Sequence, residues 1–242
     1  MTRECSADLT KMNMYVSEYK ISNNLSHPEY VDSLRNMHKC YFSAIAWNAE
    51  LQHESENFQR QYINSNEDIV FRLSESVSDL ASSFFNWING NYKASRVMLR
   101  IAIENFIRAV SSLENKSQLV EKSLYKVFDV ASKQNLFNNS LNPLVRQCYV
   151  SLHSDYKVLC ADVHTATEQN MERLSSLADF PAFHAGKSNS AASFYTRVTK
   201  NITSIFCLVF NEFFHKMHHR NKENILNGMP REIKPSINVP KR

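Results

Sequence analysis

The chain contains 242 residues, of which 43% are hydrophobic and 21% charged, and its formal net charge is +4. This composition excludes a disordered chain and is typical of a globular protein of one large or two small domains. Only three glycines and six prolines occur, too few for a turn-rich β protein. We therefore expect an all-α fold, a single-domain bundle of about six to eight helices around a central apolar helix.

Three segments are expected along the chain: a polar N-terminal segment at 1–25, the helical bundle at 26–228 and a basic C-terminal tail at 229–242. Residues 211–242 carry seven Lys or Arg against three Glu. Such a stretch is either a solvated helix end or a contact site for an anionic partner.

The cysteines and the apolar runs bear on the compartment. The five cysteines are scattered, with no Cys-x-x-Cys pair, which favours a reducing compartment without a disulfide framework. The longest strongly apolar run, 202–210, has nine residues, whereas a membrane-spanning helix needs about 20. We expect a cytoplasmic protein with no membrane contact.

The first half of the chain predicts three helices. Ser26, Pro28 and Glu29 mark a helix start, with Ser26 as the capping residue. This helix continues toward Tyr62, and a second apolar stripe follows up to Asn89-Gly90, a helix stop. The third helix, 92–113, has apolar residues over most of its circumference, which predicts a central position in the bundle.

The second half predicts four more helices. A shorter one covers 119–131, and Asn142-Pro143 opens the next, which runs to Val163. A small helix is expected at 171–177. The last runs over 191–226 and ends at the stop signal Asn227-Gly228.

Charged residues recur every four positions on the expected central helix, so they form one column on its surface. The column contains Arg96, Arg100, Glu104 and Arg108. One interpretation is an ion-pair stripe at the edge of the bundle. The other is a set of guanidinium groups, Arg96 and Arg100 among them, that bind phosphate.

The helix from Pro143 carries a second column. Arg146 and His153 lie seven residues apart, which is two helical turns, and His164 follows at close to whole turns. Tyr149 and Tyr156 lie near the same column. Histidine can act as a general acid or base near neutral pH, and arginine can stabilise charge on a phosphorane-like transition state. The row could therefore act on RNA.

The segments YKASRVMLRIAIENFIRAV and SDYKVLCADVHTAT, the spacing Arg146-x6-His153 and the helical layout resemble the HEPN superfamily, in particular its uncharacterised or abortive-infection-type prokaryotic members. The resemblance covers roughly residues 70–220. It implies a helical bundle, often dimeric, that is either a metal-independent RNase with an Arg-x4–6-His motif or a non-catalytic binding module. It implies His153 as acid or base, Arg146 as the phosphate-stabilising residue, and His164 and Arg100 as secondary candidates.

Two alternatives remain open. The motifs Glu50-x-x-His53 and Glu212-x-x-His215 have the spacing of di-metal carboxylate bundles. The chain could instead be a non-catalytic interaction module, and its fifteen Phe and ten Tyr hint at self-association through a helix face. No Gly-x-Ser-x-Gly, His-Glu-x-x-His or dinucleotide-binding motif occurs. We expect no cofactor, and RNA, a second copy or another protein as partner.

Overall fold

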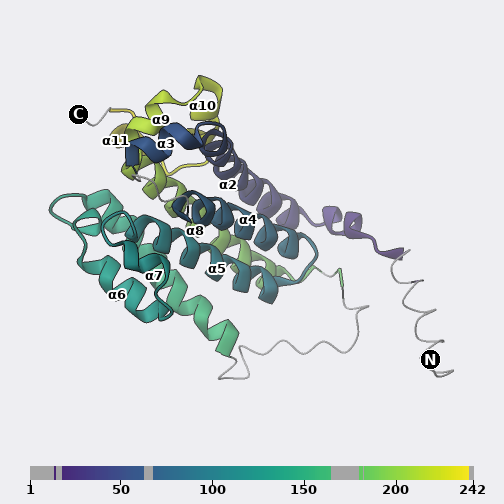
Figure 1. Ribbon diagram of the computed structural model, residues 1–242. Helices are drawn as coiled ribbons and strands as arrows, with labels where there is room; N and C mark the ends of the chain where they lie inside the picture. The colour runs from purple at the N-terminus through teal and green to yellow at the C-terminus, as the bar shows by residue number, and fades with distance from the viewer. Residues whose placement is uncertain (1–13, 15–17, 63–67, 165–179, 182, 240–242) are drawn as a thin grey trace.

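The computed structural model describes Met14 and residues 18–62, 68–164, 180–181 and 183–239. In this part of the chain the secondary structure is helical throughout, without strands (Figure 1), which confirms the predicted all-α class. None of these helices is both long and apolar enough to cross a bilayer. The longer helices are α2 (Pro28–His53), α4 (Asp68–Ile88), α5 (Tyr92–Ser111), α6 (Leu124–Lys133), α7 (Pro143–His164) and α8 (Ala185–Val209). The shorter ones are α3 (Ser55–Tyr62), α9 (Asn211–Lys216), α10 (His219–Asn227), α11 (Lys234–Ile237) and the 3₁₀ turns η1 (Ile21–Ser26), η2 (Lys116–Leu119) and η3 (Asn135–Phe137).

Several predicted helix limits hold to a few positions, but two predicted helices are divided. The helix predicted over 191–226 begins at Ala185 and forms α8, α9 and α10, and the one predicted to run toward Tyr62 forms α2 and α3. α2 begins at Pro28, and α4 ends just before Gly90, whose φ of 75° is the left-handed conformation that glycine adopts without strain. The predicted cap at Ser26 is wrong, because its hydroxyl donates to the Asn23 carbonyl at 2.7 Å and α2 starts without a side-chain cap. The break predicted at 64–66 and the small helix at 171–177 lie outside the described residues.

The bundle is organised around two long helices that pack against each other, α5 and α8. α5 also contacts α4, α6 and α7, while α8 also contacts α2, α4 and α7 (Figure 1). Every residue from Ile202 to Leu208 is buried. The nine-residue apolar run of the sequence thus lies in the middle of the protein, where it packs on several neighbours at once.

An aromatic cluster fills the end of the bundle where α2, α3, α8 and α9 meet. Phe206 stacks on Trp47 with ring centroids 4.2 Å apart and contacts Phe210 at 5.1 Å. Phe58 of α3 packs against Phe210 at 4.8 Å and Phe213 at 5.0 Å. Offset and edge-to-face pairs of this kind add stability beyond their buried area, so part of the high phenylalanine content serves the core.

The segment after α10 also packs against the bundle. Met229, Ile233 and Ile237 are buried, and the side-chain amide of Asn211 donates to the Ile237 carbonyl at 2.9 Å. At the start of this segment Gly228 lies so close to α2 that an added Cβ would stand 2.5 Å from Ser43 Cβ. The absence of a side chain at Gly228 therefore permits this contact.

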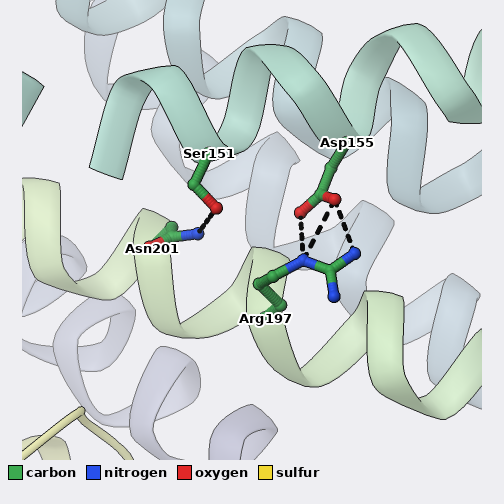
Figure 2. A network of polar contacts seen from close by, with 4 residues as sticks. All are labelled: Ser151, Asp155, Arg197 and Asn201. Atoms are coloured by element: carbon green, nitrogen blue, oxygen red, sulfur yellow. Dashed lines mark hydrogen bonds and ion pairs between the residues drawn. The ribbon is translucent and has the colours of Figure 1, made fainter. Parts of the chain in front are cut away.

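Polar contacts fix α7 on α8 (Figure 2). The guanidinium of Arg197 on α8 donates from Nε and Nη2 to the carboxylate of Asp155 on α7, at distances from 2.6 to 3.0 Å. One turn away on each helix, the Asn201 amide donates to the Ser151 hydroxyl at 2.9 Å. Because Asp155 is buried while Arg197 is 43% exposed on its side chain, the pair joins the core to the surface and sets the rotation of α7.

Replacement of Gly228 by Ala should destabilise the protein, because the new methyl group must displace Ser43 or the backbone of α2. We expect a loss of about 1–3 kcal/mol in the free energy of unfolding, measured by urea denaturation. The matched control is Gly186→Ala in the first turns of α8, where no atom lies within 4 Å of the added Cβ. That variant should be neutral or up to about 1 kcal/mol more stable; equal losses at both positions would contradict the close contact.

Asp155→Asn removes the charge that Arg197 binds but keeps the size of the side chain. Because Arg197 is partly exposed, we expect a loss of about 1–2 kcal/mol in a thermal or urea unfolding experiment. Asp32→Asn is the control: its partner Arg35 is 75% exposed, and the change should stay within about 0.5 kcal/mol. An Asp155→Asn variant as stable as the control would show that the Arg197 pair does not hold α7.

Candidate functional site

The outer side of α7 presents a row of basic and imidazole side chains. Arg146, Val150, His153 and Lys157 follow one another at helical spacing, and none of the four is fully buried. Two turns separate Arg146 from His153, which is about 10 Å along the helix axis. The predicted column therefore faces away from the α8 contact, beside helix α6.

Arg146 is held by two contacts at the start of this row. Its Nη1 donates to the backbone carbonyl of Ser132 in α6 at 3.2 Å, and its guanidinium lies over the Tyr149 ring at 5.6 Å. Within the described residues no further hydrogen bond from this guanidinium is found. Its remaining N–H groups can therefore bind an anion.

His153 lies at the mouth of a cavity of about 390 Å³ between α6 and α7. Its ring stacks on Phe128 with centroids 4.8 Å apart and an interplanar angle of 10°. Lys157 and Tyr156 line the cavity from α7, and Ser132, whose carbonyl binds Arg146, lines it from α6. The stacking fixes the imidazole plane while its edge stays accessible from the cavity.

The surroundings of His153 lower its pKa below the ordinary 6.5. Partial burial is the largest cause, and the positive charges of Lys157 and Arg146 add to it. The carboxylate of Asp129 also lines the cavity, but it is bound to Lys133 at 2.7 Å. At pH 7 the imidazole is neutral and able to accept a proton.

Tyr149 and Tyr156, predicted to bind RNA, are both buried. The hydroxyl of Tyr149 donates to the Phe128 carbonyl at 2.7 Å, and that of Tyr156 donates to Glu104 at 3.1 Å. For Tyr149 the RNA-binding role is corrected: with 1% of its surface exposed, its ring offers no face to a ligand. Both tyrosine rings pack against the ring of Phe128, with centroid distances of 4.4 Å for Tyr156 and 6.4 Å for Tyr149.

The arginine column of α5 points into the bundle. Arg100 forms an ion pair with Glu104 at 2.7 Å, the two side chains being 17% and 15% exposed. Arg108 donates to the carbonyls of Gln118 and Glu121 and so anchors the turn after α5. The phosphate-binding role of Arg100 is corrected to the ion-pair stripe, because its charge is compensated inside the bundle.

Arg96 lies apart from the cavity beside His153. The Arg96 guanidinium stacks over Phe194 of α8 at 4.8 Å, on the same ring as Arg197. His164 is the last residue of α7, and its side chain lies outside the described part of the structure. Of the predicted site residues, His153 and Tyr156 thus line one cavity, and Arg146 binds the carbonyl of Ser132 in its wall.

Two further residues that line the cavity, Lys157 and Tyr125, could contact a ligand and were not among the predicted site residues. Lys157 follows His153 by four positions, so the same helical spacing that singled out Arg146 and His153 indicates it as well. Tyr125 of α6 is 82% exposed at the cavity rim, where a base could stack on its ring. No signal in the sequence placed α6 against α7, so Tyr125 could be found only in the structure.

The two Glu-x-x-His motifs of the alternative metal reading serve other contacts. Glu50 accepts hydrogen bonds from the His218 backbone N–H at 3.1 Å and the Asn221 amide at 2.7 Å. His215 pairs with the Ile237 carbonyl at 3.0 Å, and the His53 side chain is 81% exposed. In the described portion of the chain no three His, Cys, Asp or Glu residues gather as a metal site would require.

Comparisons of the chain with protein-family models, with curated proteins and with solved structures find no significant match. The geometry of the site is therefore the only basis from which its function can be inferred.

The pKa of His153 can be measured by following its ring protons by NMR as pH is changed. We expect a value below 6.5, and a higher value in Lys157→Ala, because a positive charge beside the imidazole is removed. Lys122→Ala, an exposed lysine in the turn before α6, is the control and should leave the titration unchanged. A His153 pKa above 6.5 in the unaltered protein would contradict the arrangement.

Proposed function

We propose that this protein is a HEPN-like, prokaryotic defence- or toxin-type ribonuclease that cleaves RNA without a metal ion at the cavity between α6 and α7. One observation carries the proposal: a neutral, accessible His153 stands between two cations, Arg146 and Lys157, on the outer side of one helix. RNA supplies both groups that such a site needs, a phosphate for the cations and a nearby 2′-hydroxyl for the base.

The chemistry follows from these groups. The neutral imidazole of His153 takes the proton of the 2′-hydroxyl, and the 2′-oxygen attacks the adjacent phosphorus. Arg146 and Lys157 stabilise the negative charge that develops on the phosphorane oxygens. The bond to the 5′-oxygen breaks, that oxygen takes a proton from solvent, and His153 returns its proton to solvent. The products are a 2′,3′-cyclic phosphate and a free 5′-hydroxyl.

The exposed ring of Tyr125 suits an unpaired base of the substrate. Stacking on an aromatic ring contributes about 1–3 kcal/mol per base and tolerates any base. We therefore propose single-stranded RNA, which can lay a base on Tyr125 and its phosphate beside Lys157, as the substrate.

A second candidate is a non-catalytic interaction module, which exposed aromatic residues on α4 favour. Phe71 and Phe85 are 67% and 65% exposed, and they lie on roughly the same side of this helix. Apolar side chains left in water are typical of surfaces that pair with another copy or another protein. This candidate requires no reactivity of His153.

The proposed activity is tested with a fluorescent single-stranded RNA in buffer with EDTA. We expect cleavage that survives EDTA, and a fall of about 10²-fold or more in His153→Ala, because the general base is lost. Lys157→Ala should also slow cleavage, by about tenfold or more, because the positive charge that stabilises the phosphate in the transition state is removed. The rate of the unaltered enzyme should rise with pH through the lowered pKa of His153 and then level off.

His53→Ala is the matched control, since this histidine is 81% exposed on α2, and should cleave at the unaltered rate. Circular dichroism melts of each variant separate a folding defect from a loss of activity. Absence of cleavage in the unaltered protein, or full activity in His153→Ala, would exclude the ribonuclease proposal. Sedimentation of Phe71→Ser and Phe85→Ser variants would then test the interaction module.

A further inference from the structure

A cavity of about 670 Å³ lies on another side of the bundle, between α2, α8 and the turn after α10. Residues at helical spacing on α2 form one wall, from Ser33 to Cys40, and a stripe of α8 from Asn189 to Lys200 forms the second. Asn227, Gly228 and Met229 close the third side. Volumes of this size are typical of sites for small-molecule ligands.

The charges around this cavity have one sign. Lys39, Arg197 and Lys200 line it, and no carboxylate is among the described residues of its wall. Asp155 binds Arg197 from α7 through Nε and Nη2, which leaves Nη1 outside that ion pair. Lys39 and Lys200 have no counter-ion among the described residues of this wall. Two such cations favour an anionic ligand, because they repel each other when the cavity is empty.

Cys40 lines the cavity together with Lys39 of α2 and Lys200 of α8. This thiol lies in the cavity wall, and both Lys200 and Lys39 exert an electrostatic effect on it although they come from different helices. Burial outweighs this effect and raises the pKa of the thiol to about 11. Cys40 is therefore neutral at pH 7 and does not compensate the lysine charges.

The rest of the wall combines polar side chains with Ala192, Cys40 and Met229, and no aromatic ring is among its described residues. Three asparagines and three hydroxyl-bearing residues line the cavity, and such side chains both donate and accept hydrogen bonds. They are Asn36, Asn189, Asn227, Ser33, Ser193 and Thr196. A wall of this kind suits the hydroxyl groups of a polyol, whereas a nucleobase requires an apolar or aromatic face.

We propose that this cavity binds a phosphorylated polyol of sugar-phosphate size. Lys39, Lys200 and Nη1 of Arg197 hold the phosphate, and the amides and hydroxyls of α2 and α8 bind the hydroxylated body. The proposal does not rest on the ribonuclease proposal, because the two cavities share no residue.

The site is built into the packing of the bundle. Gly228 lies against Ser43 and the carbonyl of Lys39, so the third wall is held directly on α2 next to one of the two lysines. The Ser33 hydroxyl donates to the Asn189 amide oxygen at 3.4 Å and joins the other two walls. A site whose walls are fixed in advance loses little entropy when a ligand binds.

The test is isothermal titration calorimetry, which measures the dissociation constant of the full chain for ribose 5-phosphate. Ribose, inorganic phosphate and adenosine monophosphate are titrated separately. We expect ribose 5-phosphate to bind, ribose to bind at least tenfold more weakly, and inorganic phosphate to bind more weakly than the sugar phosphate. The affinity should fall as salt is raised. Lys39→Ala and Lys200→Ala should each weaken the binding of ribose 5-phosphate by about tenfold or more.

Lys216→Ala is the matched control, because this lysine lines a different cavity that also contains Glu50, Glu54 and Glu212, and it should bind as the unaltered protein does. No binding of ribose 5-phosphate at millimolar concentration, or unaltered binding in both Lys39→Ala and Lys200→Ala, would overturn the site. Tighter binding of inorganic phosphate than of the sugar phosphate, or binding of the nucleotide more than tenfold tighter, would overturn the polyol assignment. The RNA cleavage assay on Lys200→Ala should be unchanged, which separates the two proposals.

Discussion

α8 is enclosed by its neighbours over two turns, and the positions of both candidate sites follow from this burial. From Ile202 to Leu208 no side chain is more than 3% exposed, so α2, α5 and α7 must all pack against this stretch. Of the two hydroxyl groups within it, that of Ser204 donates to the Lys200 carbonyl at 2.7 Å, whereas that of Thr203 has no hydrogen-bond partner among the described residues. α7 and α2 pack against α8 with one side each. α7 also lines the cavity beside His153, and α2 also lines the cavity beside Lys39.

Burial separates the positively charged side chains into two groups: those that bind partners inside the bundle and those that remain available to a ligand. Arginines that point inward have their charge compensated within the bundle: Arg100 by Glu104, and Arg72 and Arg108 by carbonyls of the turn after α5. A buried cation without such partners would be strongly destabilising. Lys157 and Lys39 lie on the outside, where water solvates them and where their charge remains available to a ligand.

Helix limits were the part of the fold most accessible to prediction. Pro28, Gly90 and Pro143 act on the backbone directly, through a fixed φ, a left-handed φ or a missing N–H, so they mark helix ends whatever surrounds them. The prediction that Ser26 caps α2 is wrong because a serine hydroxyl can also bond to nearby backbone carbonyls. Here it donates to the carbonyl of Asn23 in η1. The hydrogen-bond partner of a polar side chain depends on distances and angles in the folded chain, which the order of residues does not specify.

Sequence alone determined the helical class, the breaks marked by proline or glycine and the fact that Arg146 and His153 share a side of one helix, because these depend on backbone conformation and on a spacing of 3.6 residues per turn. It did not indicate the breaks after His53, Val209 and Lys216. Tertiary structure decided which column faces inward and which residues meet across helices. The charged column of α5 lies inside the bundle and that of α7 on its surface, although in the sequence both are basic residues at helical spacing. Phe128 under His153, Tyr125 at the cavity rim and the lysines of α2 and α8 around one cavity come from distant segments. Their convergence depends on the rotation of each helix in the bundle, which the burial of α8 and the Asp155–Arg197 pair set.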